Sequence, residues 1–130
     1  MKIEKMDSDF LQTLERLKKD NSYSAYSALS NLLDSPENAD LNPLRIAILR
    51  NFTIEPILPV LKGEVSLSGF FPELYLGGFD TIAAEVFNPD SSLYQHNSDF
   101  IIIAQWLDAI SSALTTSFLS SSATHIEDKI

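Results

Sequence analysis

Two stretches near the start of the chain have apolar residues at the spacing of an amphipathic helix. In residues 8–19 and again in residues 23–33, leucine and aromatic residues recur every three or four positions and therefore share one face. A turn-rich stretch at residues 34–38 ends the second pattern. We expect an antiparallel pair of helices. The candidate N-caps are Asp7 or Ser8 for the first helix and Asn21 or Ser22 for the second.

Three short apolar runs follow, and each is typical of a strand in a parallel sheet. They occupy residues 44–49, 73–76 and 99–104. A nearly continuous apolar run indicates a strand that is covered on both faces. The third run is the richest in β-branched residues, so it predicts a central strand. Gly77 and Gly78 close the second run and predict a turn.

Helical patterns separate these strands. Residues 53–68 predict a helix with Thr53 as its N-cap, and Pro59 implies a late or distorted start. Further helices are expected at about residues 80–87 and 108–123, with an irregular stretch between residues 88 and 97.

The alternation of strands and helices predicts an α/β fold. We expect a short, parallel, three-stranded sheet flanked by helices, in residues 44–130, preceded by the helical pair in residues 1–43. The two parts should form one compact unit. So small a sheet leaves an edge open, which favours a segment truncated from a longer protein.

Composition narrows the possible functions. The absence of cysteine excludes a disulfide framework and thiolate chemistry. The net charge is −9, and residues 51–130 contain ten acidic side chains against two basic ones, so nucleic acid and anionic membranes are not expected partners. The first residues contain no apolar leader and no run approaches a membrane span, so we expect a cytoplasmic location.

Three stretches of the middle of the chain resemble FkbH-like proteins. The first extends from Arg45 to Ile57 and reads RIAILRNFTIEPI, an apolar strand that leads into Asn-Phe-Thr and a proline-containing helix. The second is residues 74–80, LYLGGFD. The third is residues 88–94, NPDSSLY, leading into residues 98–103, SDFIII. Together they place the resemblance over about residues 44–107.

The resemblance implies an N-terminal segment that full-length FkbH-like proteins join to a HAD-type phosphatase domain. Some of those proteins transfer a glyceryl unit, derived from a phosphorylated glycerate, to an acyl carrier protein in polyketide-type biosynthesis. By this resemblance, the chain is a noncatalytic accessory or docking domain whose partner is the HAD-type domain. A carrier protein would be reached through that domain, since two acidic surfaces repel each other.

The chemistry of the HAD family is not visible in this segment. It requires an aspartate nucleophile and a second aspartate two residues later at the end of a strand, where Mg²⁺ binds. The only such spacing here is Asp7-Ser8-Asp9, which precedes a predicted helix. His96 and His125 lack the spacing of metal ligands. We therefore expect no catalytic residue, metal ligand or cofactor in this chain, and Mg²⁺ would belong to the absent domain.

Candidate ligand-binding residues lie where parallel strands end, because ligands of open α/β sheets bind beyond their carboxyl ends. In Asn51 and Thr53 the plainer interpretation is a turn followed by a helix cap, and in Gly77 and Gly78 it is a simple turn. The full candidate set is Asn51, Thr53, Gly77, Gly78, Asp80 and Gln105.

Two alternative functions remain open. The layout is similar to that of SGNH-type hydrolases, so the segment could belong to such a hydrolase or acyltransferase. Where their nucleophilic serine would follow the first strand, this chain has Arg50, Asn51 and Phe52. The other alternative is a self-associating interaction domain, a homo-oligomer formed through the open edges of the sheet.

Overall fold

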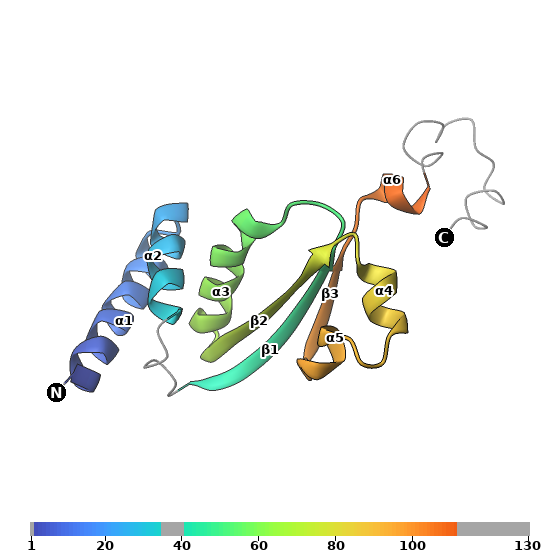
Figure 1. Ribbon diagram of the computed structural model, residues 1–130. Helices are drawn as coiled ribbons and strands as arrows, with labels where there is room; N and C mark the ends of the chain where they lie inside the picture. Colours follow the sequence, from blue (N-terminus) through green and yellow to red (C-terminus); the bar gives the residue numbers. More distant parts are fainter. Residues whose placement is uncertain (1, 35–40, 112–130) are drawn as a thin grey trace.

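The computed structural model describes residues 2–34 and 41–111, with side chains from residue 8 onward (Figure 1). Two helices precede a parallel sheet whose two faces are each covered by helices. The elements are α1 Lys2–Lys19, α2 Tyr23–Leu33, β1 Asn42–Arg50, the 3-10 turn η1 Glu55–Ile57, α3 Leu58–Leu67, β2 Phe70–Phe79, α4 Ile82–Phe87, α5 Ser92–Gln95, β3 Phe100–Ala104 and α6 Leu107–Ile110.

The three strands are parallel and follow the order β2-β1-β3, which confirms the predicted α/β class. In the middle of the sheet, Ile48 of β1 pairs with Leu76 of β2 and with Ile102 of β3. The chain crosses from β1 to β2 in one direction and from β2 to β3 in the other. Right-handed crossovers in opposite directions place α3 on one face and α4 with α5 on the other.

The position of β3 corrects one prediction. The run at residues 99–104 was expected at the centre of the sheet, but β3 lies at an edge and β1 is the central strand. The four residues 46–49 of β1 are fully buried, whereas Ile101 and Ile103 of β3 remain 52% and 57% exposed. The apolar run indicates a strand with two apolar faces. Among the described residues, β3 has a neighbouring strand on one side only, which is β1.

The helical pair is present, and one of its two cap predictions is confirmed. Ser22 caps α2, because its hydroxyl oxygen accepts a hydrogen bond from the backbone N–H of Ala25 at 3.3 Å. The cap predicted at Asp7 or Ser8 is wrong, since α1 already begins at Lys2. The residues before Asp7 include Lys, Glu and Met, which favour helix, so the helix extends toward the N-terminus.

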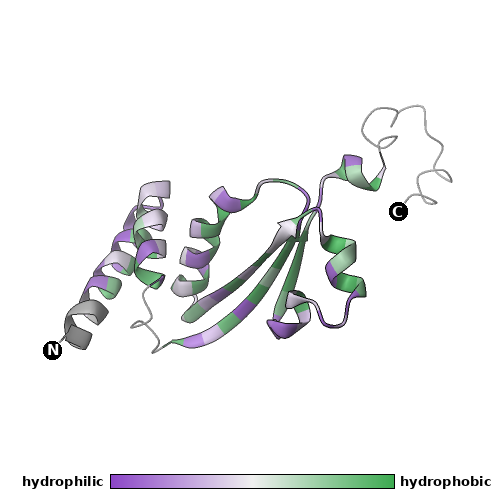
Figure 2. Ribbon diagram, in the orientation of Figure 1, coloured by the Kyte–Doolittle hydropathy of each residue, from purple (hydrophilic) through white to green (hydrophobic). Residues whose placement is uncertain are grey.

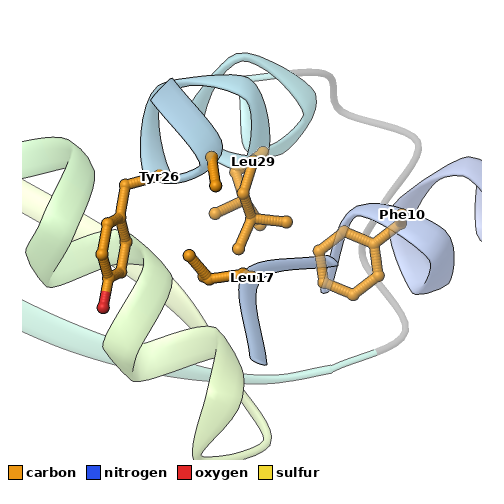
Figure 3. Close-up of a cluster of buried hydrophobic side chains, with 6 residues drawn as sticks. Phe10, Leu17, Tyr26 and Leu29 are labelled. Atoms are coloured by element: carbon orange, nitrogen blue, oxygen red, sulfur yellow. The ribbon is translucent and has the colours of Figure 1, made fainter. Parts of the chain in front are cut away.

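The pair encloses its own apolar cluster and packs on α3, away from the sheet (Figures 1 and 3). Leu17 and Leu29 are fully buried beside Phe10 and Tyr26. The Tyr26 ring lies so close to Gly63 of α3 that a Cβ there would be 2.4 Å from a ring carbon. Its hydroxyl donates to a Glu64 carboxylate oxygen at 2.5 Å, which fixes the pair against α3.

The remaining connections differ in detail from the predictions. The late start expected from Pro59 is confirmed, since α3 begins at Leu58 and the proline lies in its first turn, where no N–H donor is needed. Thr53 is exposed and is no N-cap, because η1 separates it from α3. A short helix, α5, occupies part of the stretch that was expected to be irregular.

The glycine pair and the last helix also depart from expectation. Gly77 and Gly78 are part of β2 rather than of a turn after it. The helix predicted for residues 108–123 corresponds to α6 up to Ile110, and residues 112–123 lie outside the described part of the chain. In residues 2–34 and 41–111 no helix combines the length and hydropathy that crossing a membrane requires.

We predict that the helical pair depends on Leu17. Leu17→Ala should lower the free energy of unfolding by about 2–5 kcal/mol, because it leaves a cavity among residues that are fully enclosed. Urea denaturation would measure the loss. The matched control is Leu11→Ala, in which the side chain is 57% exposed on the same helix, and it should change stability by about 0.5 kcal/mol or less. Equal losses would show that the cluster does not stabilise the chain.

Candidate functional site

The carboxyl ends of the three strands meet at one edge of the sheet, and Asn51 joins two of them. Its backbone N–H donates to the carbonyl of Ala104 at 3.2 Å, and its side-chain oxygen accepts from the backbone N–H of Trp106 at 3.0 Å. The Trp106 ring lies 4.8 Å from the Phe52 ring, between centroids. The Asn51 side chain therefore fixes the exit of β3 by a hydrogen bond to the backbone, a role that its sequence position did not reveal.

Two of the candidate residues line one cavity. Asp80 and Gln105 both line a hollow of about 560 Å³ between α4 and the end of β3. Its other walls are apolar and consist of Ile82, Ala83, Val86, Phe87 and Ile103. The volume is in the range of small-molecule sites. Neither Asn51, Thr53 nor the glycine pair lines it, so the structure brings together only part of the predicted set.

Asp80, which lines this cavity, has an unusual backbone conformation. Its φ is 57°, in the left-handed region that aspartate and asparagine tolerate better than most residues. Its N–H donates to the carbonyl of Arg50 at 3.0 Å, so the turn after β2 is connected to the end of β1. This contact directs the chain from β2 into α4 and positions the apolar wall of the cavity.

The Arg50 side chain is only 13% exposed, and the sequence did not indicate it as a site residue. Its Nε donates to the carbonyl of Gly77 at 3.3 Å, and its terminal nitrogens contact both carboxylate oxygens of Glu55 at 2.9 and 3.0 Å. A two-point ion pair of this kind fixes orientation as well as charge. Arg50 is the last residue of β1, and Asn51 and Phe52 follow the strand.

A polar cluster that the sequence did not predict lies beneath α4. The hydroxyl of Tyr75 donates to one carboxylate oxygen of Glu85, and the hydroxyl of Thr81 donates to the other at 3.1 Å. Burial, and next the hydrogen bond to Glu85, raise the pKa of Tyr75 above its ordinary value. The tyrosine therefore stays protonated and anchors α4 to β2.

Gly77 is explained by this cluster. A Cβ on Gly77 would lie 2.6 Å from a carboxylate oxygen of Glu85 and 3.0 Å from a methyl carbon of Leu49. The bare backbone thus allows α4 to lie close to the sheet. Gly77 lies eight positions before Glu85 in the sequence. One sequence alone does not indicate that the two residues come into contact.

The described residues contain no group of three His, Cys, Asp or Glu side chains that could hold a metal ion. Asp9, from the Asp-Ser-Asp triplet, lies within α1 and not after a strand. The Nδ1 of His96 is 2.8 Å from the Ser98 hydroxyl, and its ring lies 5.8 Å from the Tyr75 ring. His125 lies outside the described residues.

These features define an open parallel α/β protein with an apolar cavity at the carboxyl edge of its sheet. Its fold is similar to that of the N-terminal part of the protein BF1531 from Bacteroides fragilis, whose crystal structure contains a phosphatase domain complexed with Mg. The TM-score is 0.58 at 20% sequence identity, and the match covers 70% of this chain and 24% of that chain. At this identity the likeness shows the fold, and this chain spans about a quarter of the crystallised chain that it matches. No family model and no curated protein matches the sequence.

We predict that Gly77→Ala lowers the free energy of unfolding by about 1–3 kcal/mol, because the added methyl group displaces Glu85 and α4. Gly78→Ala is the matched control, since a Cβ there meets only the Thr81 side chain, at 3.1 Å or more. Thermal unfolding followed by circular dichroism would compare the two. A loss no greater for Gly77→Ala than for the control would contradict the close-approach explanation.

We also predict a pH effect at Glu55. The pKa of this carboxyl lies below its ordinary value of 4.5, because it accepts backbone hydrogen bonds, its own N–H first, and lies beside Arg50. A carboxyl group whose pKa is lowered in the folded state stabilises the fold at pH values above its ordinary pKa. This contribution disappears as the pH falls through the folded-state pKa. Glu55→Gln should therefore lose less stability than the natural chain on acidification below about pH 4.5. Urea titrations at several pH values measure this, and parallel pH curves would exclude it.

Proposed function

We propose that this chain is a noncatalytic accessory domain of an FkbH-like protein and that it docks onto a HAD-type catalytic domain. In that assembly the catalytic domain would hold Mg²⁺, carry out glyceryl transfer in polyketide-type biosynthesis and contact the acyl carrier protein. The observation that carries the proposal is a set of exposed apolar side chains on β3 and α4, whose ribbons are mostly green, the colour of hydrophobic residues, in Figure 2.

This docking surface consists of the side chains that β3, α4 and α6 leave in solvent. Phe87 on α4 is 84% exposed beside the cavity, and Trp106 and Leu107 extend the surface beyond the end of β3. Apolar patches of this kind on a folded domain mark interaction sites. The docking surface is formed by Val86, Phe87, Ile101, Ile103, Trp106, Leu107 and Ile110.

The polar groups at the strand ends support an accessory role. Arg50, Asn51 and Glu85 are each paired with a neighbouring side chain or backbone group that holds the fold together. What remains near the cavity is Asp80 and Gln105, which offer one carboxylate and one amide against apolar walls. Such walls suit the burial of a partner's side chain.

The resemblance of residues 44–107 to FkbH-like proteins supports the identity of the partner. The fold is similar to the N-terminal part of a protein that also contains a phosphatase domain. An N-terminal α/β segment beside a phosphatase domain is the arrangement that the FkbH resemblance implies. The proposal assigns the apolar surface to that contact.

The test is a binding measurement with the HAD-type domain of an FkbH-like protein, made by titration calorimetry. Wild-type chain should bind, and Phe87→Asp should weaken binding at least about tenfold, because it places a charge in the apolar contact. Leu11→Asp is the control on α1, outside the docking surface, and should bind like wild type. No binding by the wild-type chain, or equal weakening by both variants, would overturn the proposal.

A further inference from the structure

β3 consists entirely of apolar residues, and three of its five residues are isoleucine. Ile101, Ile102 and Ile103 lie consecutively between Phe100 and Ala104. A shift of a strand by one residue turns every side chain to the other face of the sheet. In an alternating strand this shift would place polar side chains in the core, whereas here isoleucine would replace isoleucine. The apolar side chains of β3 therefore fix its alignment on β1 only weakly.

The structure nevertheless has one defined alignment, in which Ile102 pairs with Ile48. A shift by one residue toward the amino end of β1 would bring Ile103 opposite Ile48, so the same kind of side chain would fill the position. Residues 100–107 form an uncharged strip along β3 and beyond its end, so no ion pair within the strip fixes the alignment. The polar contacts that favour this alignment lie at the two ends of the strand.

Asp99 fixes the amino end of β3. Its backbone N–H donates to the carbonyl of Arg45 at 2.8 Å, and its carboxylate accepts from the backbone N–H of Arg45 at 2.9 Å. Each residue has one N–H and one carbonyl group in its backbone. Both of these groups of Arg45 are therefore engaged by Asp99, one through the backbone and one through the side chain.

Asn51 fixes the carboxyl end in the same manner. Its backbone N–H donates to the carbonyl of Ala104 at 3.2 Å, and its side-chain oxygen accepts from the backbone N–H of Trp106 at 3.0 Å. Asp and Asn side chains are short and hold an acceptor oxygen close to the backbone. Each end of β3 is thus held by one backbone bond and one side-chain bond of this type.

The two end contacts, from Asp99 to Arg45 and from Asn51 to Ala104 and Trp106, act together. They lie at opposite ends of the same strand, so a shift by one residue in either direction would break both. All four hydrogen bonds lie on the β1 side of β3. They hold whatever lies against the other edge of the strand.

We infer that Asp99 and Asn51 are positioning residues that set the register of β3 on β1. Without their side-chain bonds, β3 also adopts the alignment in which Ile101 lies opposite Ile46. The reverse shift is disfavoured, because it places the Asp99 carboxylate opposite Ile46, which is buried.

This inference goes beyond the proposed function and does not rest on it. In the observed register, Ile101 and Ile103 lie on the face of α4 and α5, since they pair with Ala47 and Leu49. A shift by one residue would turn Ile102 to that face instead. Two polar side chains at the strand ends therefore decide which apolar groups the sheet presents on each face.

Disulfide trapping in the whole chain measures the register directly. The chain has no cysteine, so an introduced pair supplies the only thiols. Ile46→Cys with Phe100→Cys reports the observed register, since these two residues are partners. Ile46→Cys with Ile101→Cys reports the shifted register, and in the observed one its side chains point to opposite faces and cannot be bridged. Oxidation, alkylation of the remaining thiols and mass spectrometry give the disulfide yield of each pair.

Removal of both side-chain acceptors should change the ratio of the two yields. Asn51→Ala combined with Asp99→Ala should raise the yield of the shifted pair relative to the observed pair at least about fivefold, because two hydrogen bonds are lost. Asn51→Asp combined with Asp99→Asn is the matched control, which keeps both acceptor oxygens and should restore the natural ratio. An unchanged ratio in the alanine variant would overturn the inference, as would an equal change in the control.

The single alanine variants decide the question if circular dichroism shows that the double variant does not fold. Each should raise the ratio about twofold or more. Amide hydrogen exchange should become faster at the Trp106 N–H in Asn51→Ala and at the Arg45 N–H in Asp99→Ala, each at its own end of the strand. Faster exchange spread evenly over the sheet, with no change in the disulfide ratio, would show a general loss of stability and contradict the positioning role.

Discussion

The structure depends on the complete burial of the middle of β1. Ile46 and Ile48 face α3, and Ala47 and Leu49 face α4 and α5, so both layers of helices are built on four consecutive residues. The strand is also hydrogen-bonded on both sides, to β2 and to β3. Because β1 has a neighbouring strand on each side, the crossover from β1 to β2 and the crossover from β2 to β3 run in opposite directions. The carboxyl edge, where β1 ends at Arg50 and Asn51 follows, takes its shape from that arrangement.

The polar residues at this edge mainly connect elements. Asn51 connects β1 to the exit of β3, Arg50 connects β1 to Glu55 and to β2, and Glu85 holds α4 on Tyr75. Each of these three side chains forms its hydrogen bonds with other residues of the same chain. The cavity that these contacts frame is mostly apolar.

Local pattern was enough to predict the strands and most helices, because apolar runs and helical spacing follow from the burial of nearby residues. The order of the strands was not predictable in this way. The run at residues 99–104 indicates two apolar faces, and it cannot indicate whether this chain or another polypeptide covers them. The edge position of β3 therefore became clear only from the structure.

The candidate site was predicted in part for similar reasons. The strand ends could be located, so Asp80 and Gln105 were found, and the structure places both at one cavity. The importance of Arg50, Glu85 and the bare backbone of Gly77 depends on contacts between residues five to 27 positions apart. The sequence pattern of Gly77 and Gly78 predicts a turn. Their place in a strand is explained only by the Glu85 carboxylate, which leaves no room for a side chain at Gly77.

The uncharged strip along β3 has a consequence for how this protein responds to its solution. The acidic remainder of the surface repels another copy over the Debye length, about 30 Å at 0.01 M salt and about 8 Å at 0.15 M. The attraction between apolar strands acts only at contact. Dilute buffer therefore keeps other acidic molecules at a distance from this strip, and physiological ionic strength shortens that distance to less than the width of a helix. The ionic strength of the surroundings thus sets how closely an acidic molecule can approach the apolar strip.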